Sequence, residues 1–271
     1  MNQRLIRFMV YLSAFVTFAS LFLIVGFIFW NGLPSLEPSL FEWEYTTENV
    51  SLMPAIITTI IVVVLSLVIV TPLGIFTGFY LVEYAKRDSK IVEIIRIAAD
   101  TLAGIPSIVY GLFGMLFFVI FLGFQYSILA GVLTSVIMVL PIIIRSTEEG
   151  LLGVPDSLRQ ASFGLGAGKL RTIFKVVLPA AMPSILSGVI LSIGRIIGET
   201  AALMYTLGTA ANMPTGLFSS SRTLALHMYV LSSEGLHVQK AYATGVILVT
   251  LVIIINMITT TISKRIIQGE V

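Results

Sequence analysis

Cysteine is absent from this chain of 271 residues, and histidine and charged residues are scarce. Without cysteine there is no disulfide, no thiolate nucleophile and no cysteine-built metal centre. Two histidines, His227 and His237, are too few for a histidine metal site. Charged residues make up 11 % of the chain, against roughly 25 % in ordinary soluble domains. The net charge of +2 is too small to indicate a nucleic-acid partner.

Hydrophobic residues are abundant instead, at 57 % of the chain, with a mean hydropathy of +1.01. Apolar runs of about 18 residues or more predict spanning helices. Six such runs cover approximately residues 8–30, 54–82, 94–122, 127–144, 184–208 and 241–262. The first run is too long for a signal peptide, so we expect it to be retained. We therefore predict a single all-α integral membrane domain over residues 1–271 with six transmembrane helices.

The basic residues predict how this domain is oriented, because cytoplasmic loops carry an excess of Lys and Arg. They gather in alternate segments between the runs: Arg4, Arg7, Lys86, Arg87, Lys90, Arg145, Arg159, Lys169, Arg171, Lys175, Lys264 and Arg265. The segment 31–53 contains four glutamates and no basic residue. Both termini are therefore expected to be cytoplasmic. On the other side, the pattern of residues 222–234 predicts a short amphipathic helix lying on the bundle or on the membrane interface.

Two opposite charges, Arg195 and Glu199, lie four residues apart in the fifth run, so a helix would place them on one face. An ionisable group inside a membrane helix costs about 2.5–3.5 kcal/mol on insertion scales and by default indicates function. A helix starting at Ser184 reaches Arg195 after about 17 Å, near the middle of a hydrocarbon core about 30 Å thick. We assign Arg195, Glu199 and Thr200 to substrate translocation or gating. The alternative is an ion pair that only fixes this helix to a neighbour.

The third run contains a second pair with this spacing, Arg96 and Asp100. This pair either anchors the helix near the interface, or Asp100 braces a gate in the translocation path. Further along, Gly104 and Pro106 interrupt the same run. Proline removes a backbone donor and predicts a kink, so we assign both residues to a helix hinge. An ordinary packing kink is the alternative.

The loop of residues 145–183 is long for a membrane protein of this size. Its stretch 164–170 has a glycine-rich look, but Phe163 and Leu170 break the Walker A pattern, so we expect no nucleotide site. The sequence also offers no nucleophile beside a base and no carboxylate pair in a polar pocket. We therefore expect a transport subunit, not an enzyme, with no metal and no cofactor bound by this chain.

The same loop resembles the EAA loop of ABC-importer membrane subunits, E-A-A-x3-G-x9-I-x-L-P. Alanine, glycine and the terminal Leu-Pro are in register, whereas Gln160 replaces the usual Glu and Val176 the usual Ile. Gly166 permits a turn after a short helix, which makes a compact knob for a cytoplasmic partner. In that family the knob couples the permease to its ATPase. The resemblance assigns this coupling role to Gln160, Ala161, Ser162, Gly166, Lys169, Leu178 and Pro179.

Four further segments, 100–114, 154–159, 194–200 and 234–242, resemble the phosphate-specific permease family, and residues 222–245 are closer to its PstA branch than to PstC. The resemblance implies a type I ABC-importer permease fold in the plasma (inner) membrane of a prokaryote, importing inorganic phosphate. It implies four kinds of partner besides lipid: a PstC-like second permease, a PstB-like ATPase dimer that binds ATP and Mg, a PstS-like external phosphate-binding protein, and phosphate itself.

In the mechanism that we expect, ATP binding moves the knob, and Pro179 and Pro183 pass this movement to the fifth helix and Arg195. Three alternatives stay open from the sequence. The chain could carry another oxyanion such as sulfate or molybdate, since arginine recognises them all. It could be an ion-coupled secondary carrier, or a scaffold or sensor that transports nothing.

Overall fold

The computed structural model describes residues 3–86 and 89–268, and every regular element in this part of the chain is helical. Arg87, one of the basic residues used to predict the topology, lies outside the described residues. The helices are α1 (Gln3–Gly32), α2 (Met53–Phe79), α3 (Lys90–Gly104), α4 (Ser107–Gly114), α5 (Ile128–Leu152), α6 (Asp156–Gly164), α7 (Lys169–Thr172), α8 (Leu178–Ile197), α9 (Ala201–Thr206), α10 (Leu224–Glu234) and α11 (Val238–Gln268). Short π-helical turns follow α2 (Tyr80–Tyr84) and α4 (Met115–Phe121) and join α7 to α8 (Ile173–Val177), and 3-10 turns cover Leu33–Ser35 and Pro38–Phe41.

Five of the described helices are long and apolar enough to cross a membrane, and the pair α3 and α4 supplies a sixth candidate if it counts as one span. The largest corrections to the predicted bounds are four. The fourth helix continues beyond residue 144 to Leu152, and α8 begins at Leu178, before residue 184, so the predicted loop 145–183 is partly helical. The third run is not one helix, because α3 and α4 meet at an angle of 105°. The fifth run does not continue to residue 208, because α8 ends at Ile197 and α9 is a separate short helix.

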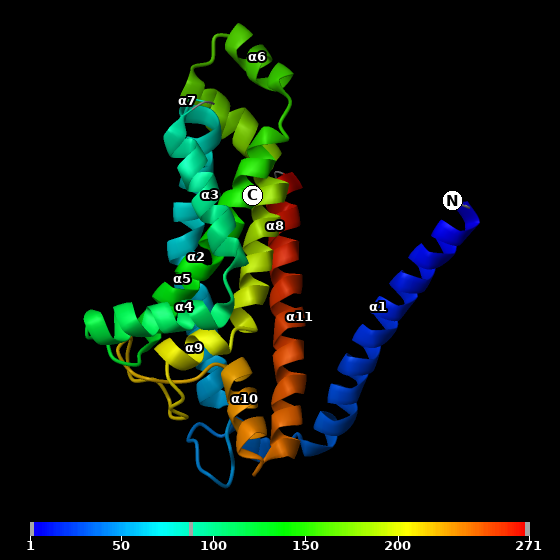
Figure 1. Ribbon diagram of the computed structural model, residues 1–271, viewed down its shortest axis with the longest axis vertical. Helices are drawn as coiled ribbons and strands as arrows, with labels where there is room; N and C mark the ends of the chain where they lie inside the picture. The colour runs from blue at the N-terminus through cyan, green and yellow to red at the C-terminus, as the bar shows by residue number, and fades with distance from the viewer. Residues whose placement is uncertain (1–2, 87–88, 269–271) are drawn as a thin grey trace.

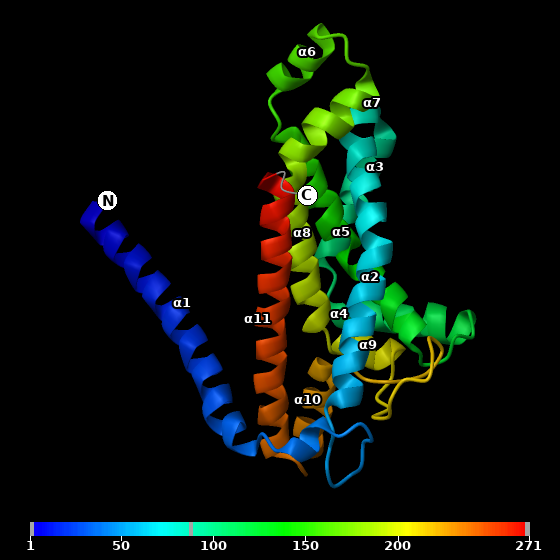
Figure 2. The ribbon, with the colours of Figure 1, turned by 180° about the vertical axis from the view of Figure 1, so that it is seen from behind.

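The long helices α2, α5, α8 and α11 stand side by side as a bundle (Figures 1 and 2). Helices α6 and α7 project at one end, which we call the α6 end, and α10 lies at the opposite, α10 end (Figure 1). Helices α4 and α9 lie across the bundle between the two ends. Helix α1 leans away and meets the bundle only at the α10 end, where the Phe27 and Tyr242 rings lie 5.7 Å apart.

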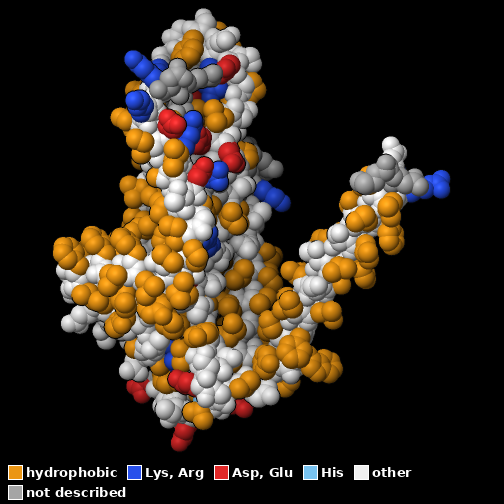
Figure 3. All heavy atoms as spheres, viewed as in Figure 1, with side chains coloured by type: hydrophobic (Ala, Val, Ile, Leu, Met, Phe, Trp, Pro, Cys, Tyr) orange, Lys and Arg blue, Asp and Glu red, His pale blue; other side chains and the backbone are white. Residues whose placement is uncertain are grey.

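Hydrophobic side chains cover the middle of the molecule, and most charged side chains gather towards its ends (Figure 3). Along α1 the most apolar window of 18 residues has no buried residue. An apolar belt between two charged ends is the surface that a protein in a bilayer needs, because the hydrocarbon core does not solvate charge. The basic residues predict that the α6 end is the cytoplasmic one.

Helices α2 and α5 pack closely because small residues line their contact. A Cβ added to Gly74 would lie 2.6 Å from Ile143 Cγ2, and one added to Gly78 would lie 2.6 Å from Thr147 Cγ2. Small residues let two membrane helices approach until their backbones nearly touch, which increases van der Waals contact where no hydrophobic effect is available. This contact fixes the centre of the bundle.

Helix α10 is inserted into the bundle, whereas the sequence predicts an amphipathic helix on its surface. Four successive residues, Leu224–His227, are buried, so the helix has no polar face in its first turn. The Leu224 N–H donates to Thr59 Oγ1 of α2 at 2.9 Å. The Arg222 guanidinium lies 5.0 Å from the centroid of the Tyr45 ring, and that ring meets His227 edge to face. These contacts attach the loop before α2 to α10.

The close approach at Gly74 predicts a stability defect on substitution. In Gly74→Ala the new methyl group collides with Ile143, and we expect a loss of about 1–3 kcal/mol in the free energy of unfolding. The measurement is thermal unfolding of the assembled transporter in lipid nanodiscs. Gly26→Ala is the matched control, since no atom lies within 4 Å of its added Cβ. Equal melting temperatures for the two variants would contradict the proposed contact.

His227 predicts a dependence of stability on pH. Burial, and secondly the charge of Arg222, lower the pKa of His227 to about 3, against about 6.5 in the unfolded chain. The unfolded state therefore binds more protons between these values, so stability rises with pH from about 3 to 6.5 and is constant above. Lowering the pH from 7 to 5 should remove about 2 kcal/mol. In thermal unfolding at both pH values, His227→Gln should lose this contribution and the control His237→Gln should keep it.

Candidate functional site

Two helix breaks create the candidate site. Helix α3 ends at Gly104, Ile105 and Pro106 are extended, and α4 starts at Ser107. Pro106 has no N–H to continue α3, and the chain turns far beyond the ordinary kink that proline produces. The second break lies between α8 and α9, where the chain leaves the helix at Gly198. Gly104 and Pro106 thus lie at the first break, and their role as a hinge stays a prediction.

The two breaks lie against each other. A Cβ added to Gly111 of α4 would lie 2.9 Å from Ala202 Cα of α9, so these short helices touch closely. The Tyr110 hydroxyl donates to the Leu102 carbonyl at 2.5 Å and holds α4 against the last turn of α3. We call the region formed by Tyr110, Arg195, Glu199 and Thr200 the helix-break site.

Glu199 does not share a helix face with Arg195, so the predicted arrangement is wrong. Helix α8 ends two residues before Glu199, and Glu199 is 8 % exposed. Its Oε1 accepts a hydrogen bond from the Ala202 N–H at 3.0 Å. The first N–H groups of a helix have no partner within it, so the carboxylate caps α9 and faces its positive end. Thr200 precedes α9 but makes no side-chain capping bond.

Arg195 lies in the last turn of α8 and is partly buried. Helix α9 follows α8 after a short break and packs on α4, so the end of α8 lies in the region where the two breaks meet. Among the described residues, Arg195 forms no ion pair and no hydrogen bond through its side chain. A guanidinium offers a planar fork of donors that matches the oxygens of phosphate or carboxylate. The helix-break site therefore has a cation that can bind an oxyanion.

Asp100 lies on α3, and it does not pair with Arg96 as its spacing predicts. Arg96 instead contacts Glu148 of α5, with 2.7 Å between Nε and Oε1, and Asp100 pairs with Arg145 of α5 at 3.0 Å. The two ion pairs lie beside a cavity of about 210 Å³. Both Arg145 and Asp100 are about half exposed, at 53 % and 55 %. Each of these ion pairs thus connects α3 to α5, and neither joins two residues of α3.

The coupling residues fall on two sides of the α6–α7 segment. Gln160 and Ala161 are exposed, whereas the Ser162 hydroxyl is buried and lies 2.8 Å from Thr172 Oγ1. Gly166 has a φ of +79°, in the region that favours glycine, and turns the chain after α6. Lys169 starts α7, and Leu178 and Pro179 start α8. The outward residues are available to a partner, and the inward ones hold the segment together.

Sequence reasoning missed three residues that the structure makes important: Tyr110, Glu148 and Glu83. A lone tyrosine in an apolar run does not indicate a role, because only the folded chain brings the Leu102 carbonyl within reach of its hydroxyl. Glu148 follows Arg145 in a segment of good helix formers, and that helical signal could have extended the fourth helix. Glu83 is a single acid at the end of an apolar run, which could have been read as an anchor.

Comparison with known proteins identifies the family. The family described as binding-protein-dependent transport system inner membrane component matches residues 70–268. A probable ABC transporter permease protein, YqgI of Bacillus subtilis (strain 168), is 34 % identical over 71 % of this chain and 71 % of its own length. The phosphate transport system permease protein PstA of Mycobacterium leprae (strain TN) is 38 % identical over 72 % of this chain, and that of Yersinia pestis is 39 % identical over 70 %. The chain spans 64 % and 65 % of these two PstA proteins.

Solved structures share the fold. A chain of the methionine ABC transporter MetNI in an inward-facing conformation has a TM-score of 0.59 and 20 % identity, over 79 % of this chain and 94 % of its own. A chain of a bacterial ABC transporter that imports alginate has a TM-score of 0.69 and 13 % identity, over 97 % and 98 %. The predicted type I ABC-importer permease fold is confirmed. The chain belongs to the inner membrane components of binding-protein-dependent ABC importers.

Proposed function

We propose that this chain is the permease subunit of an ATP-driven importer that moves inorganic phosphate into the cytoplasm. The PstA proteins that it resembles support phosphate as the substrate. The observation that carries the proposal is the Arg195 guanidinium, which is partly buried at the helix-break site and has no carboxylate partner among the described residues.

The chemistry of the helix-break site suits transient binding. Phosphate carries between one and two negative charges near neutral pH, and the guanidinium fork can donate to two of its oxygens. Glu199 keeps a negative charge nearby while it caps α9. Because that charge opposes a second anion, phosphate is held weakly enough to leave, as conduction requires. Thr200 lies next to the carboxylate and would contact the passing anion.

Membership in a family of binding-protein-dependent importers implies a binding protein and an ATPase as partners. Within the proposal these partners are a PstB-like ATPase dimer and a PstS-like phosphate-binding protein, beside a PstC-like second permease. ATP and Mg are bound by the ATPase, and this chain binds no cofactor.

Movement of α6 reaches Arg195 along the chain itself. Helix α7, the π turn of Ile173–Val177 and α8 form one helical segment, with Pro179 and Pro183 near the start of α8. Arg195 lies at its far end, so reorientation of α8 would change the side to which the guanidinium is open. The Asp100–Arg145 pair, half exposed between α3 and α5, would serve as a gate that opens when these helices separate.

Substitution of Arg195 tests the proposal. Arg195→Gln removes the charge and the fork, and we expect the initial rate of phosphate uptake to fall by about 10- to 100-fold, the value of a hydrogen bond to a charged group. Arg195→Lys keeps the charge without the fork and should lie between Gln and wild type. The measurement is labelled phosphate uptake by the assembled transporter in proteoliposomes. Arg265→Gln, at an exposed position of α11, should be unaffected.

Three outcomes would reject parts of this proposal. Wild-type uptake by both Arg195 variants would remove Arg195 from the mechanism. If excess sulfate or molybdate inhibited uptake as well as unlabelled phosphate does, the substrate would be a broader class of oxyanion. Uptake by the purified chain alone, driven by an ion gradient, would instead indicate a secondary carrier.

The capping bond of Glu199 gives a separate prediction. Glu199→Gln keeps an oxygen that can accept from the Ala202 N–H, whereas Glu199→Ala removes it. We expect Ala to lower the free energy of unfolding by about 0.5–2 kcal/mol, as at other helix caps, and Gln to lower it less. Thermal unfolding of the assembled transporter measures both. Equal losses for Gln and Ala would show that the charge of Glu199 matters and the cap does not.

A further inference from the structure

Glu83 is an acidic residue outside the helix-break site, in the π turn that ends α2 at the α6 end. Its side chain is only 11 % exposed. A charged group that has lost most of its water needs an opposite charge and hydrogen bonds, because desolvation costs several kcal/mol per ion. The partners of Glu83 come from α6 and α7, the segment assigned to ATPase coupling.

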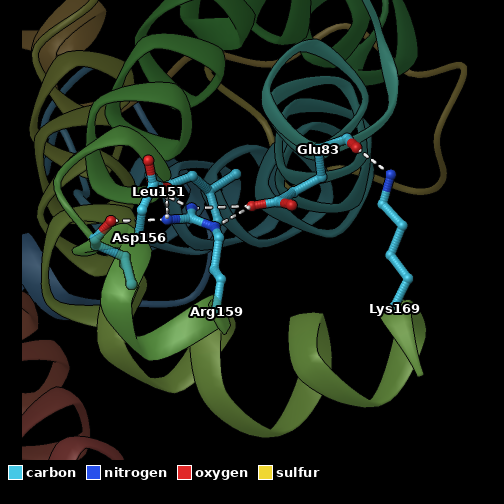
Figure 4. Close-up of polar contacts among 6 residues, drawn as sticks. Glu83, Leu151, Asp156, Arg159 and Lys169 are labelled. Atoms are coloured by element: carbon cyan, nitrogen blue, oxygen red, sulfur yellow. Dashed lines mark hydrogen bonds and ion pairs between the residues drawn. The ribbon is translucent and has the colours of Figure 1, made fainter. Parts of the chain in front are cut away.

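The first partner is Arg159 of α6. Its Nε and NH2 atoms both donate to Glu83 Oε1, at 3.2 and 2.9 Å. The same guanidinium donates to the carbonyls of Leu151 at 2.8 Å and Val154 at 2.7 Å, at the end of α5 and just after it (Figure 4). Arg159 is 15 % exposed. One largely buried guanidinium thus ties α6 to the ends of both α2 and α5.

The second partner is Lys169, the first residue of α7. Its ammonium group donates to the backbone carbonyl of Glu83 (Figure 4). It also lies 4.5 Å from the centroid of the Tyr84 ring. Between these two anchors, the hydroxyls of Ser162 and Thr172 connect α6 to the end of α7. The α6–α7 segment is therefore a closed unit, and both of its anchors reach the same turn of α2.

The α6–α7 segment also carries exposed apolar side chains. Phe163 is 47 % exposed and Leu165 is 90 % exposed. Apolar side chains that project from a compact element are suited to fill pockets of a protein partner. A force applied to these side chains would reach α2 through Arg159 and Lys169, because separating the partners of a buried ion pair is strongly unfavourable. Helix α2 would carry α5 with it, since Gly74 and Gly78 hold the two in close contact.

We infer that Glu83 is a positioning residue that transmits the displacement of the α6–α7 segment into α2. The ATPase then acts on two helices at once: on α8 through the continuous chain, and on α2 through the Glu83 contacts. Glu83 touches neither the substrate nor the nucleotide in this scheme. The inference rests on the proposed function only in that the chain is coupled to an ATPase.

The test compares ATP hydrolysis with uptake in the assembled transporter, reconstituted in proteoliposomes with its binding protein. In Glu83→Ala we expect basal ATP hydrolysis to persist and the number of ATP molecules hydrolysed per phosphate imported to rise. The expected rise is about fivefold or more, because coupling between two sites typically changes an equilibrium by at least that factor. Glu83→Gln keeps one neutral acceptor for Arg159 and should show a smaller rise. A role in stability alone would lower the melting temperature without changing this ratio.

Asp156→Asn is the matched control within the same network. Asp156 also contacts Arg159, at 3.2 Å, but it is 73 % exposed, and exposed ion pairs contribute little. The number of ATP molecules that Asp156→Asn hydrolyses per phosphate imported should equal that of wild type. An Asp156→Asn ratio as high as that of Glu83→Ala would overturn the inference, as would a wild-type ratio in Glu83→Ala.

A double variant covers failure of assembly. If Glu83→Ala does not assemble because Arg159 is left without its counter-charge, Glu83→Ala with Arg159→Ala leaves no buried charge and should assemble but stay uncoupled. A wild-type ratio in this double variant would also overturn the inference. If the wild-type transporter imports no phosphate, the proposed function fails. The role of Glu83 is then tested with the oxyanion that stimulates ATP hydrolysis, by the number of ATP molecules hydrolysed per oxyanion imported.

Discussion

The arrangement depends on one constraint: a helix may break inside a membrane protein only where the freed backbone groups find partners. At the first break the Tyr110 hydroxyl donates a second hydrogen bond to the Leu102 carbonyl, which also accepts from the Ile105 N–H, and at the second the Glu199 carboxylate accepts from the Ala202 N–H. Both partners are buried and both come from residues beside the breaks. These two bonds permit short helices to cross the bundle, and the crossing brings Arg195 to the junction.

The same constraint gives different roles to Arg195 and Glu199, which the sequence spacing presents as a pair. Glu199 caps α9 through one carboxylate oxygen, and among the described residues no ion pair joins it to Arg195. A guanidinium at the end of α8 is stabilised in part by the negative end of the helix dipole, which attracts a cation without occupying its donors. The same residue can therefore be tolerated in an apolar setting and still remain free to bind an anion.

Much of the fold was predictable because length and apolarity report directly on membrane spans. The apolar runs identify the long helices, and Pro106 marks the first break, since a proline cannot continue the hydrogen bonding of α3. Residue spacing failed where charges have partners on other helices. Arg96 and Asp100 each find an opposite charge on α5, and no local pattern says which helix will be the neighbour. The 105° turn was equally inaccessible, because a proline fixes where a helix ends and tertiary packing fixes where the chain goes next.

The candidate site was predictable in part for the same reason. Arg195 stands out because a charge in an apolar run is rare, and the EAA-like pattern marks the α6–α7 segment. Glu83 acts through contacts with residues far along the chain, and the bond of Tyr110 depends on how the chain turns at the first break, so neither role has a comparable signal in the sequence.

Helix α1 has a consequence for how this polypeptide should be handled. It joins the bundle only near its last turns, where Gly32 fits against the Tyr242 backbone, and most of its apolar length has no cover from the rest of the chain. The apolar side chains of α1 therefore contact the surroundings of the protein, whether acyl chains, detergent or another polypeptide, and these contacts set the tilt of the helix. The orientation of this helix is a property of the environment as much as of the sequence, and replacing lipid by detergent changes the helix before it changes the bundle.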